Sequence, residues 1–153
     1  MEIQLLSSSH SVGEANYHLQ FTPAYRRDIF ADELVKILTR DYLLAAASRH
    51  GITLSAIGFG PDHVHVFCTH CKNYSPSQAA KLLKGFSSYM MRKHHIQLFV
   101  DKLYGEKFWS AGYFYRTVGA VNSDTVNRYV EQSQDKHWKK ESKQTKLMEF
   151  ATN

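Results

Sequence analysis

Short alternating or apolar segments of the chain predict four β-strands, over residues 15–22, 52–59, 63–69 and 112–121. The first shows the clearest period of two, because Tyr17, Leu19 and Phe21 alternate with Asn16, His18 and Gln20. Gly60-Pro61-Asp62 stands between the second and third strands and predicts a tight turn there. The second and third strands are therefore expected to form a hairpin.

Helical spacing of apolar side chains predicts three helices. The first begins after Asp32 and ends at Gly51, the second begins at Ser75-Pro76, and the third is capped by Ser123 and extends to about Trp138. The resulting order, β-α-β-β-α-β-α, begins like a ferredoxin-like (RRM-like) α+β fold, in which helices cover an antiparallel sheet. We expect one domain over residues 1–153, with a core at about 14–138 and a basic tail at about 139–153.

Composition excludes several classes of protein. With 43% apolar and 22% charged residues the chain is typical of globular proteins, and its two cysteines do not suggest a disulfide scaffold. No apolar run approaches the roughly 20 residues that cross a bilayer, and the start MEIQLLSSSH does not resemble a signal peptide. We expect a cytoplasmic protein without membrane contact.

Charge is distributed unevenly along the chain. The net charge of +5 divides into −2 up to His70 and +7 from Cys71 onward, and the chain also has nine Tyr and nine Phe. Basic side chains interleaved with aromatic rings are typical of surfaces that bind single-stranded nucleic acid. Charge and rings together therefore favour a polyanionic partner.

The sharpest local motif is Pro61-Asp62-His63-Val64-His65. On a strand His63 and His65 point to the same face, so that two imidazoles can chelate one divalent ion. The alternative is a pair of structural strand histidines. The nearby Cys68-Thr69-His70-Cys71 is a C-x-x-C, but Cys68 and His70 have the wrong parity to join the histidine pair, so two ordinary thiols are the simpler interpretation.

The last predicted helix, SDTVNRYVEQSQDKHW, has a narrow apolar face made by Val126 and Val130. At about 100° per residue, Gln132 and Lys136 lie close to the side of the helix that carries Tyr129. A tyrosine, an amide and an ammonium on one side suggest a nucleophile with phosphate and metal contacts. The alternative is a tyrosine that packs its ring against a neighbour.

These motifs together resemble a known family, the single-tyrosine HUH transposases of the TnpA type, in the IS200-like superfamily encoded by small bacterial and archaeal insertion sequences. The resembling segments are YHLQFTPAYRR, GPDHVHVF, SQAAKLLKGFSSYMMRKH, FWSAGYFYRTVG and VNRYVEQ, in family order over about Tyr17 to Gln134.

The resemblance implies an activity. His63 and His65 are expected to bind Mg²⁺ or Mn²⁺, and Tyr129 to attack a DNA phosphodiester, leaving a 5′-phosphotyrosine that rejoining reverses. The expected substrates are single-stranded DNA hairpins at the ends of the element, and the expected assembly is a homodimer. The family's third metal ligand is a Gln at the position of Ser133 here, so Gln132 is the preferred substitute, ahead of Gln134.

Basic and aromatic side chains of the resembling segments are the expected DNA contacts. They are Arg26, Arg27, Lys81, Lys84, Arg92, Lys93, Trp109, Tyr113 and Lys136. Three other functions stay open at this stage: a REP-associated tyrosine transposase, a non-catalytic ferredoxin-like domain that binds nucleic acid, and a small zinc protein.

Overall fold

The computed structural model describes residues 3–6, 16–69, 71, 73–119, 121–122 and 124–131. They fall into two compact units, divided between Val121 and Asn122. The first unit holds a five-stranded sheet with its helices, and the second holds the helix over residues 124–131.

The strands of the first unit are β1 (Ile3–Leu5), β2 (Asn16–Phe21), β3 (Thr53–Gly60), β4 (His63–Thr69) and β5 (Phe114–Val118). They form one antiparallel sheet in the order β1-β3-β4-β2-β5. The four predicted strands are present in the ferredoxin-like order, which confirms the α+β expectation. The short edge strand β1 was not predicted, and β5 is shorter than the segment 112–121.

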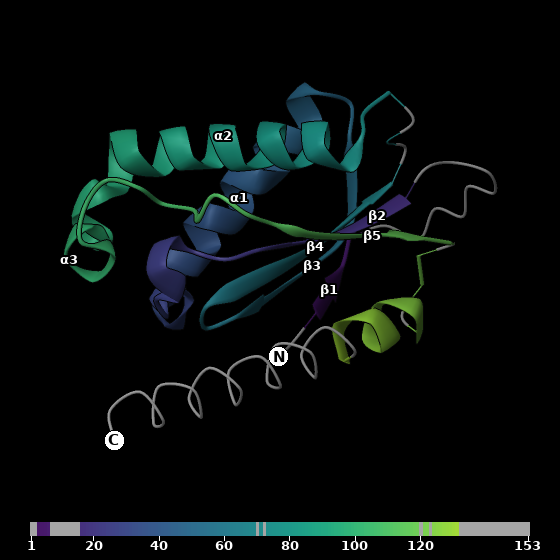
Figure 1. Cartoon of the computed structure of the whole chain (residues 1–153), viewed down its shortest axis with the longest axis horizontal. Helices are drawn as coiled ribbons and strands as arrows, with labels where there is room; N and C mark the ends of the chain where they lie inside the picture. Colours follow the sequence, from purple (N-terminus) through teal and green to yellow (C-terminus); the bar gives the residue numbers. More distant parts are fainter. Residues whose placement is uncertain are drawn as a thin grey trace, which may run out of the picture. The chain divides into compact units, whose positions relative to one another are not determined.

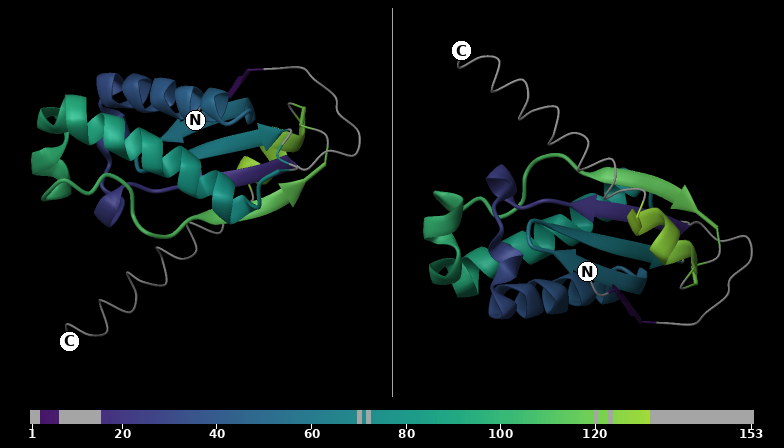
Figure 2. Two further views of the ribbon diagram at one scale, coloured as in Figure 1. Left: turned by 90° about the horizontal axis from the view of Figure 1, so that it is seen from above. Right: turned by 90° about the horizontal axis from the view of Figure 1, so that it is seen from below.

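The longer helices are α1 (Glu33–Arg49) and α2 (Pro76–His95), and they lie side by side on one face of the sheet (Figures 1 and 2). Four short helical turns connect these elements: η1 (Ala24–Arg26), η2 (Ile29–Ala31), η3 (Ile96–Leu98) and α3 (Val100–Leu103). Within the described ranges no helix is both long and apolar enough to cross a membrane.

Both long helices begin where their capping residues predict, and α1 also ends where Gly51 predicts. The Asp32 carboxylate accepts hydrogen bonds from the backbone N–H groups of Leu34 and Val35, and Gly51 follows the end of α1 with a φ of 68°. Ser75 and Gln78 form a capping box at the start of α2, with Pro76 at the first helical position. Local chemistry thus fixes where the two helices start.

The core lies between the sheet and the two helices. It is formed by alternate residues of the strands, among them Leu19, Phe21, Val64 and Val66, with apolar side chains of α1 and α2. Because side chains alternate across a sheet, the intervening residues of β2 and β4 point to the opposite face. His18, His63 and His65 belong to that second face.

The described helix over residues 124–131 agrees with the predicted start, and its observed capping contact comes from Asn122. The Asn122 side chain accepts hydrogen bonds from the backbone N–H (2.9 Å) and hydroxyl (3.0 Å) of Thr125, so Asn122 makes the capping contact. Ser123, which the sequence favoured as the cap, lies outside the described residues. Asn and Ser are nearly equivalent as caps, so propensity alone could not separate the two neighbours.

Candidate active site

The two histidines of the Pro61–His65 motif lie together on the sheet. The turn at Pro61-Asp62 leads directly into β4, and the alternation of that strand sends His63 and His65 to the same face. Their ring centroids are 4.9 Å apart and the rings are nearly perpendicular, at 85°. The strand thus brings the two imidazoles close enough together to bind one ion.

Two residues of the hairpin determine the surroundings of the His63 ring: the preceding residue, Asp62, and the cross-strand partner, Gly60. Nδ1 of His63 lies 2.8 Å from the Asp62 carboxylate, which can only accept, so in the neutral ring Nδ1 carries the hydrogen and Nε2 the lone pair. Gly60 is the cross-strand partner of His63. A Cβ at Gly60 would lie 2.7 Å from Nδ1 and 2.8 Å from Nε2 of His63, so only glycine leaves room for this ring.

His65 is held from the neighbouring strand. His18 of β2 is fully buried and its Nε2 lies 2.9 Å from Nδ1 of His65. The His18 ring stacks on Phe67, at 4.4 Å and 3°. Burial, with the nearby positive charge of Arg116, lowers the pKa of His18 to about 4, so this ring is neutral at neutral pH. His65 is therefore oriented by a neutral, fixed imidazole.

The donor set of this pair fits a divalent metal ion. Each imidazole uses Nδ1 within the protein, which is the usual arrangement when Nε2 is the metal ligand. Imidazole is a common ligand of divalent transition-metal ions, whereas Mg²⁺ prefers oxygen ligands. In the described part of the chain no group of three His, Cys, Asp or Glu side chains is placed to hold a metal ion.

Tyr129 lies in the helix over residues 124–131 and is half-buried. The Arg128 guanidinium stacks on its ring, 5.1 Å from the centroid. Gln132 and Lys136, which were predicted to lie on the same side of the helix as Tyr129, are outside the described residues. The alternative metal ligands Ser133 and Gln134 are outside them too.

The two cysteines do not join the histidine pair. Cys68 belongs to the apolar core on the opposite face of β4, and Cys71 is also fully buried. A hydrogen bond with Cys71, together with burial, raises the pKa of Cys68 well above its ordinary value. The same hydrogen bond lowers the pKa of Cys71. Both thiols lie in the apolar core, so the structure does not bring the cysteines and the histidine pair into one site. His70 lies outside the described residues.

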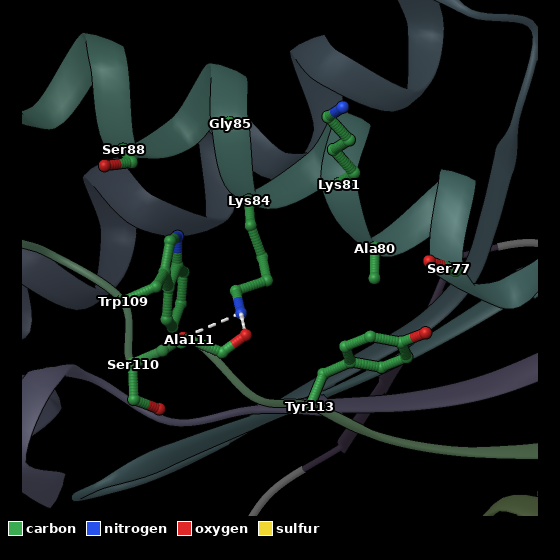
Figure 3. A pocket seen from close by; sticks show the side chains of 10 residues that line it. All are labelled: Ser77, Ala80, Lys81, Lys84, Gly85, Ser88, Trp109, Ser110, Ala111 and Tyr113. Atoms are coloured by element: carbon green, nitrogen blue, oxygen red, sulfur yellow. Dashed lines mark hydrogen bonds between the residues drawn. The ribbon is translucent and has the colours of Figure 1, made fainter.

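Three of the four predicted basic contacts on α2 are exposed: Lys81, Arg92 and Lys93. Lys84 differs, because its ammonium donates to the backbone carbonyls of Ser110 (2.7 Å), Ala111 (3.4 Å) and Gly112 (2.9 Å). Figure 3 shows this side chain reaching from the helix to the segment below it. In this structure Lys84 ties that segment to α2.

Lys84 stands in a hollow of about 380 Å³ between α2 and residues 109–113. Trp109 and Tyr113 flank it, as Figure 3 shows. Trp109 is 5% exposed and donates its indole N–H to the Ser87 hydroxyl (2.9 Å), so it is mainly a core residue. Tyr113 is half-buried and presents its ring to the hollow.

The basic turn after β2 is partly engaged within the protein. The Arg27 guanidinium donates to the Lys102 carbonyl (3.1 Å) and stacks on Tyr104, 5.2 Å from the ring centroid. Arg26 is half-buried and adopts a positive φ of 53°. Both remain near the surface, at one end of the sheet.

Sequence reasoning did not assign roles to His18, Gly60 or Asp62. Gly60 and Asp62 are recognisable in the sequence as turn residues, and a turn pattern does not show which side chain they contact. His18 has the strand parity of the second sheet face, which was a usable signal. Its contact with His65, however, depends on the pairing of β2 with β4, and strand register is not local information.

Comparison with known proteins agrees with the fold and the motif. The family described as "Transposase IS200 like" matches residues 11–133. The ISDra2 transposase TnpA of Deinococcus radiodurans is 29% identical over 125 residues, which cover 82% of this chain and 88% of that protein. The transposase for insertion sequence element IS200 of Salmonella typhimurium is 28% identical over 124 residues, 81% of this chain and 80% of that one.

A crystal structure of a transposase from Deinococcus radiodurans R1 has a similar fold. It matches with a TM-score of 0.61 and 26% identity over 82% of this chain and 95% of that chain. The class of protein is thus a DNA transposase. The chain belongs to the IS200-like transposase family, which confirms the resemblance in the sequence.

Proposed function

We propose that this transposase cleaves and rejoins single-stranded DNA at the hairpins of an insertion sequence, with Tyr129 as the nucleophile and His63 and His65 as metal ligands. The observation that supports this most is the histidine pair. Both rings share one sheet face, and each has its Nδ1 engaged by a neighbour. Engagement of Nδ1 within the protein is the usual arrangement when Nε2 binds a metal ion.

The reaction exchanges one phosphodiester bond for another. The Tyr129 hydroxyl loses its proton and its oxygen attacks the phosphorus. The bond from phosphorus to the 3′-oxygen breaks, and that oxygen takes up a proton to become a free 3′-OH. The product is a 5′-phosphotyrosine diester, and attack by a 3′-OH reverses the step, so no nucleotide cofactor is consumed.

A divalent ion on His63 and His65 would polarise the scissile phosphate and stabilise the leaving oxygen. We propose Mn²⁺ or Mg²⁺, with Gln132 as a further ligand, because a serine at position 133 offers a weaker donor than an amide. Gly60 and Asp62 hold the ring of His63 in place for this role.

The exposed side of α2 is the proposed DNA surface. Lys81 and Arg92 are 11 residues apart, which on a helix places them on the same side and about 16 Å apart along the axis. Ser77, Gly85 and Ser88 lie on the same side and line the hollow beside Trp109 and Tyr113. Cations with small residues between them let a phosphate backbone approach, and the Tyr113 ring can stack on a base.

Lys93 also faces solvent on this helix, and Arg26 and Arg27 offer further positive charge at the turn after β2. We include these three residues and Lys136 as further phosphate contacts. Lys84 and Trp109 support the surface from beneath through their internal hydrogen bonds. We also propose a homodimer, for which light scattering should give twice the chain mass of 17.6 kDa.

Covalent capture tests the proposed chemistry. Single-stranded oligonucleotides that tile the two DNA flanks of the gene are incubated with the full chain and Mn²⁺, then separated under denaturing conditions. The wild-type chain should form an adduct that survives denaturation on at least one oligonucleotide, and should form none on the same sequences as duplexes. Tyr129→Phe and His63→Ala should lose the adduct.

Tyr115→Phe is the matched control, because Tyr115 lies on β5, 53% exposed, on the sheet face opposite the histidine pair. It should form the adduct as the wild type does. An adduct that persists in Tyr129→Phe would overturn the assigned nucleophile. Binding of single-stranded DNA without any adduct would favour the non-catalytic binding domain instead.

A further inference from the structure

The two histidines of the pair have different hydrogen-bond partners at Nδ1. His63 has a carboxylate from its own turn, Asp62, whereas the Nδ1 of His65 meets another imidazole, that of His18 on the neighbouring strand. One of these two rings donates and the other accepts, so the tautomer of one fixes the tautomer of the other. A ligating His65 needs its lone pair on Nε2, and therefore its hydrogen on Nδ1.

We infer that His18 is the positioning residue of His65: its Nε2 accepts the Nδ1–H of His65 and so keeps the lone pair of His65 on Nε2. Nothing in this role requires His18 to touch metal or DNA. The inference rests on the proposed function, because it takes His65 as a metal ligand.

The surroundings of His18 suit such a fixed acceptor. Its ring stacks flat on Phe67, at 4.4 Å and 3°, and meets the edge of Phe114, with centroids 6.1 Å apart. His18 and His65 are both fully buried. Packing therefore holds the plane of the ring, and burial limits the supply of a replacement hydrogen bond from water.

The strand register explains how His18 reaches this position. Gln20 of β2 is the direct cross-strand partner of His65, and His18 lies two residues further along, opposite Phe67. Residues two apart on a strand share a face, and diagonal neighbours in a sheet are within reach of ring side chains. The contact is thus built into the β2–β4 ladder.

Two substitutions separate the hydrogen bond of His18 from its packing. His18→Phe keeps an aromatic ring against Phe67 but cannot accept a hydrogen bond. His18→Gln loses the ring but places an amide oxygen where Nε2 stands, so it can still accept. If His18 has a purely structural role, His18→Phe should retain Mn²⁺ binding better than His18→Gln. If His18 positions His65, His18→Gln should retain it better.

The first measurement is Mn²⁺ binding to the full chain by titration calorimetry. We expect His18→Phe to weaken Mn²⁺ binding about 10–100-fold, as loss of an outer-shell partner usually does, and His18→Gln to stay within a few-fold of the wild type. His95→Phe is the control, because it removes a histidine that bonds a tyrosine hydroxyl, Tyr42 (2.7 Å), away from the pair. It should leave Mn²⁺ binding unchanged.

The second measurement needs no metal. Long-range ¹H–¹⁵N NMR spectra of the metal-free chain report the tautomer of each histidine, assigned among the nine by the variants. His65 should carry its hydrogen on Nδ1 in the wild type and in His18→Gln, and should shift toward Nε2–H in His18→Phe. Wild-type His65 with its hydrogen on Nε2 would overturn the inference.

The failure of this inference can be distinguished from failure of the proposed function. Equal Mn²⁺ affinity in the wild type and His18→Phe would refute the role of His18 alone. Absence of Mn²⁺ binding by the wild type would refute the metal site, and this inference with it.

Discussion

Gly60 shows how strongly a single residue limits the position of a proposed metal ligand. Its backbone lies directly under the His63 ring, so that any side chain would occupy the space of the imidazole. The Asp62 carboxylate contacts the same ring through Nδ1. The observed position of His63 therefore depends on the absence of a Cβ at Gly60 and on this carboxylate.

Gly60→Ala should displace the His63 ring and weaken Mn²⁺ binding by at least about tenfold, since misplacing a ligand costs as much as losing its outer-shell support. Calorimetry with Mn²⁺ is the measurement. Gly119→Ala is the matched control, because a Cβ there meets nothing within 4 Å. If both alanine variants bind Mn²⁺ like the wild type, the His63 ring does not hold the metal in the position described.

Residue-level features were predictable only where they are local. The shared face of His63 and His65 follows from the period of a strand, and the sequence alone predicted it. The contacts of His18 with His65 and of Gly60 with His63 arise from cross-strand pairing, which one sequence does not reveal. The residues that contact the two histidines were therefore missed, although the pairing of the histidines on one face was predicted.

At the level of elements, α2 uses its lysines in two different ways. Lys84 donates to three backbone carbonyls of residues 110–112, whereas Lys81, one turn earlier, is exposed. Sequence reasoning placed both among the DNA contacts, because helical spacing shows which residues lie away from the core but not which segment packs beside the helix. The structure gives Lys84 an internal role.

Lys84→Met and Lys81→Met should change different properties, the first the stability of the protein and the second its DNA binding. Lys84→Met leaves carbonyls without their charged donor and should lower the free energy of unfolding by about 1.5–3 kcal/mol. Lys81→Met should change that free energy by less than about 0.5 kcal/mol, yet should weaken binding of single-stranded DNA and reduce its salt dependence.

Urea denaturation and fluorescence anisotropy with a labelled oligonucleotide measure the two effects. An equal loss of stability in both variants would contradict the internal role of Lys84. Unchanged DNA affinity in Lys81→Met would contradict the proposed surface on α2.

The helices and strands themselves were largely predictable, because their signals are local. Asp32 and the Ser75-Gln78 capping box mark the starts of α1 and α2 in both sequence and structure. Strand β1 was missed because its three residues, Ile3–Leu5, are too few to show an alternation of apolar and polar side chains. It is recognised as a strand only through its pairing with β3. Strand β5 ends earlier than its apolar pattern because only Phe114–Val118 pair with β2.

Across the whole molecule, the uneven charge of the sequence corresponds to a division of roles. The half up to His70, with a net charge of −2, supplies four of the five strands and both proposed metal ligands. The half from Cys71, with a net charge of +7, supplies α2, its exposed cations and Tyr129. The fold and the family agree with a transposase, and the proposed chemistry joins these two halves.

Mass spectrometry of the covalent adduct tests this central claim most directly. Trypsin cleaves after Arg116, Arg128 and Lys136, so the peptides 129–136 and, with a missed cleavage, 117–136 each hold Tyr129 as their single tyrosine among the nine of the chain. After nuclease trimming of an adduct made with Mn²⁺, the nucleotide mass should appear on these peptides, joined through a 5′-phosphate. A nucleotide mass on any other tyrosine peptide would contradict the account.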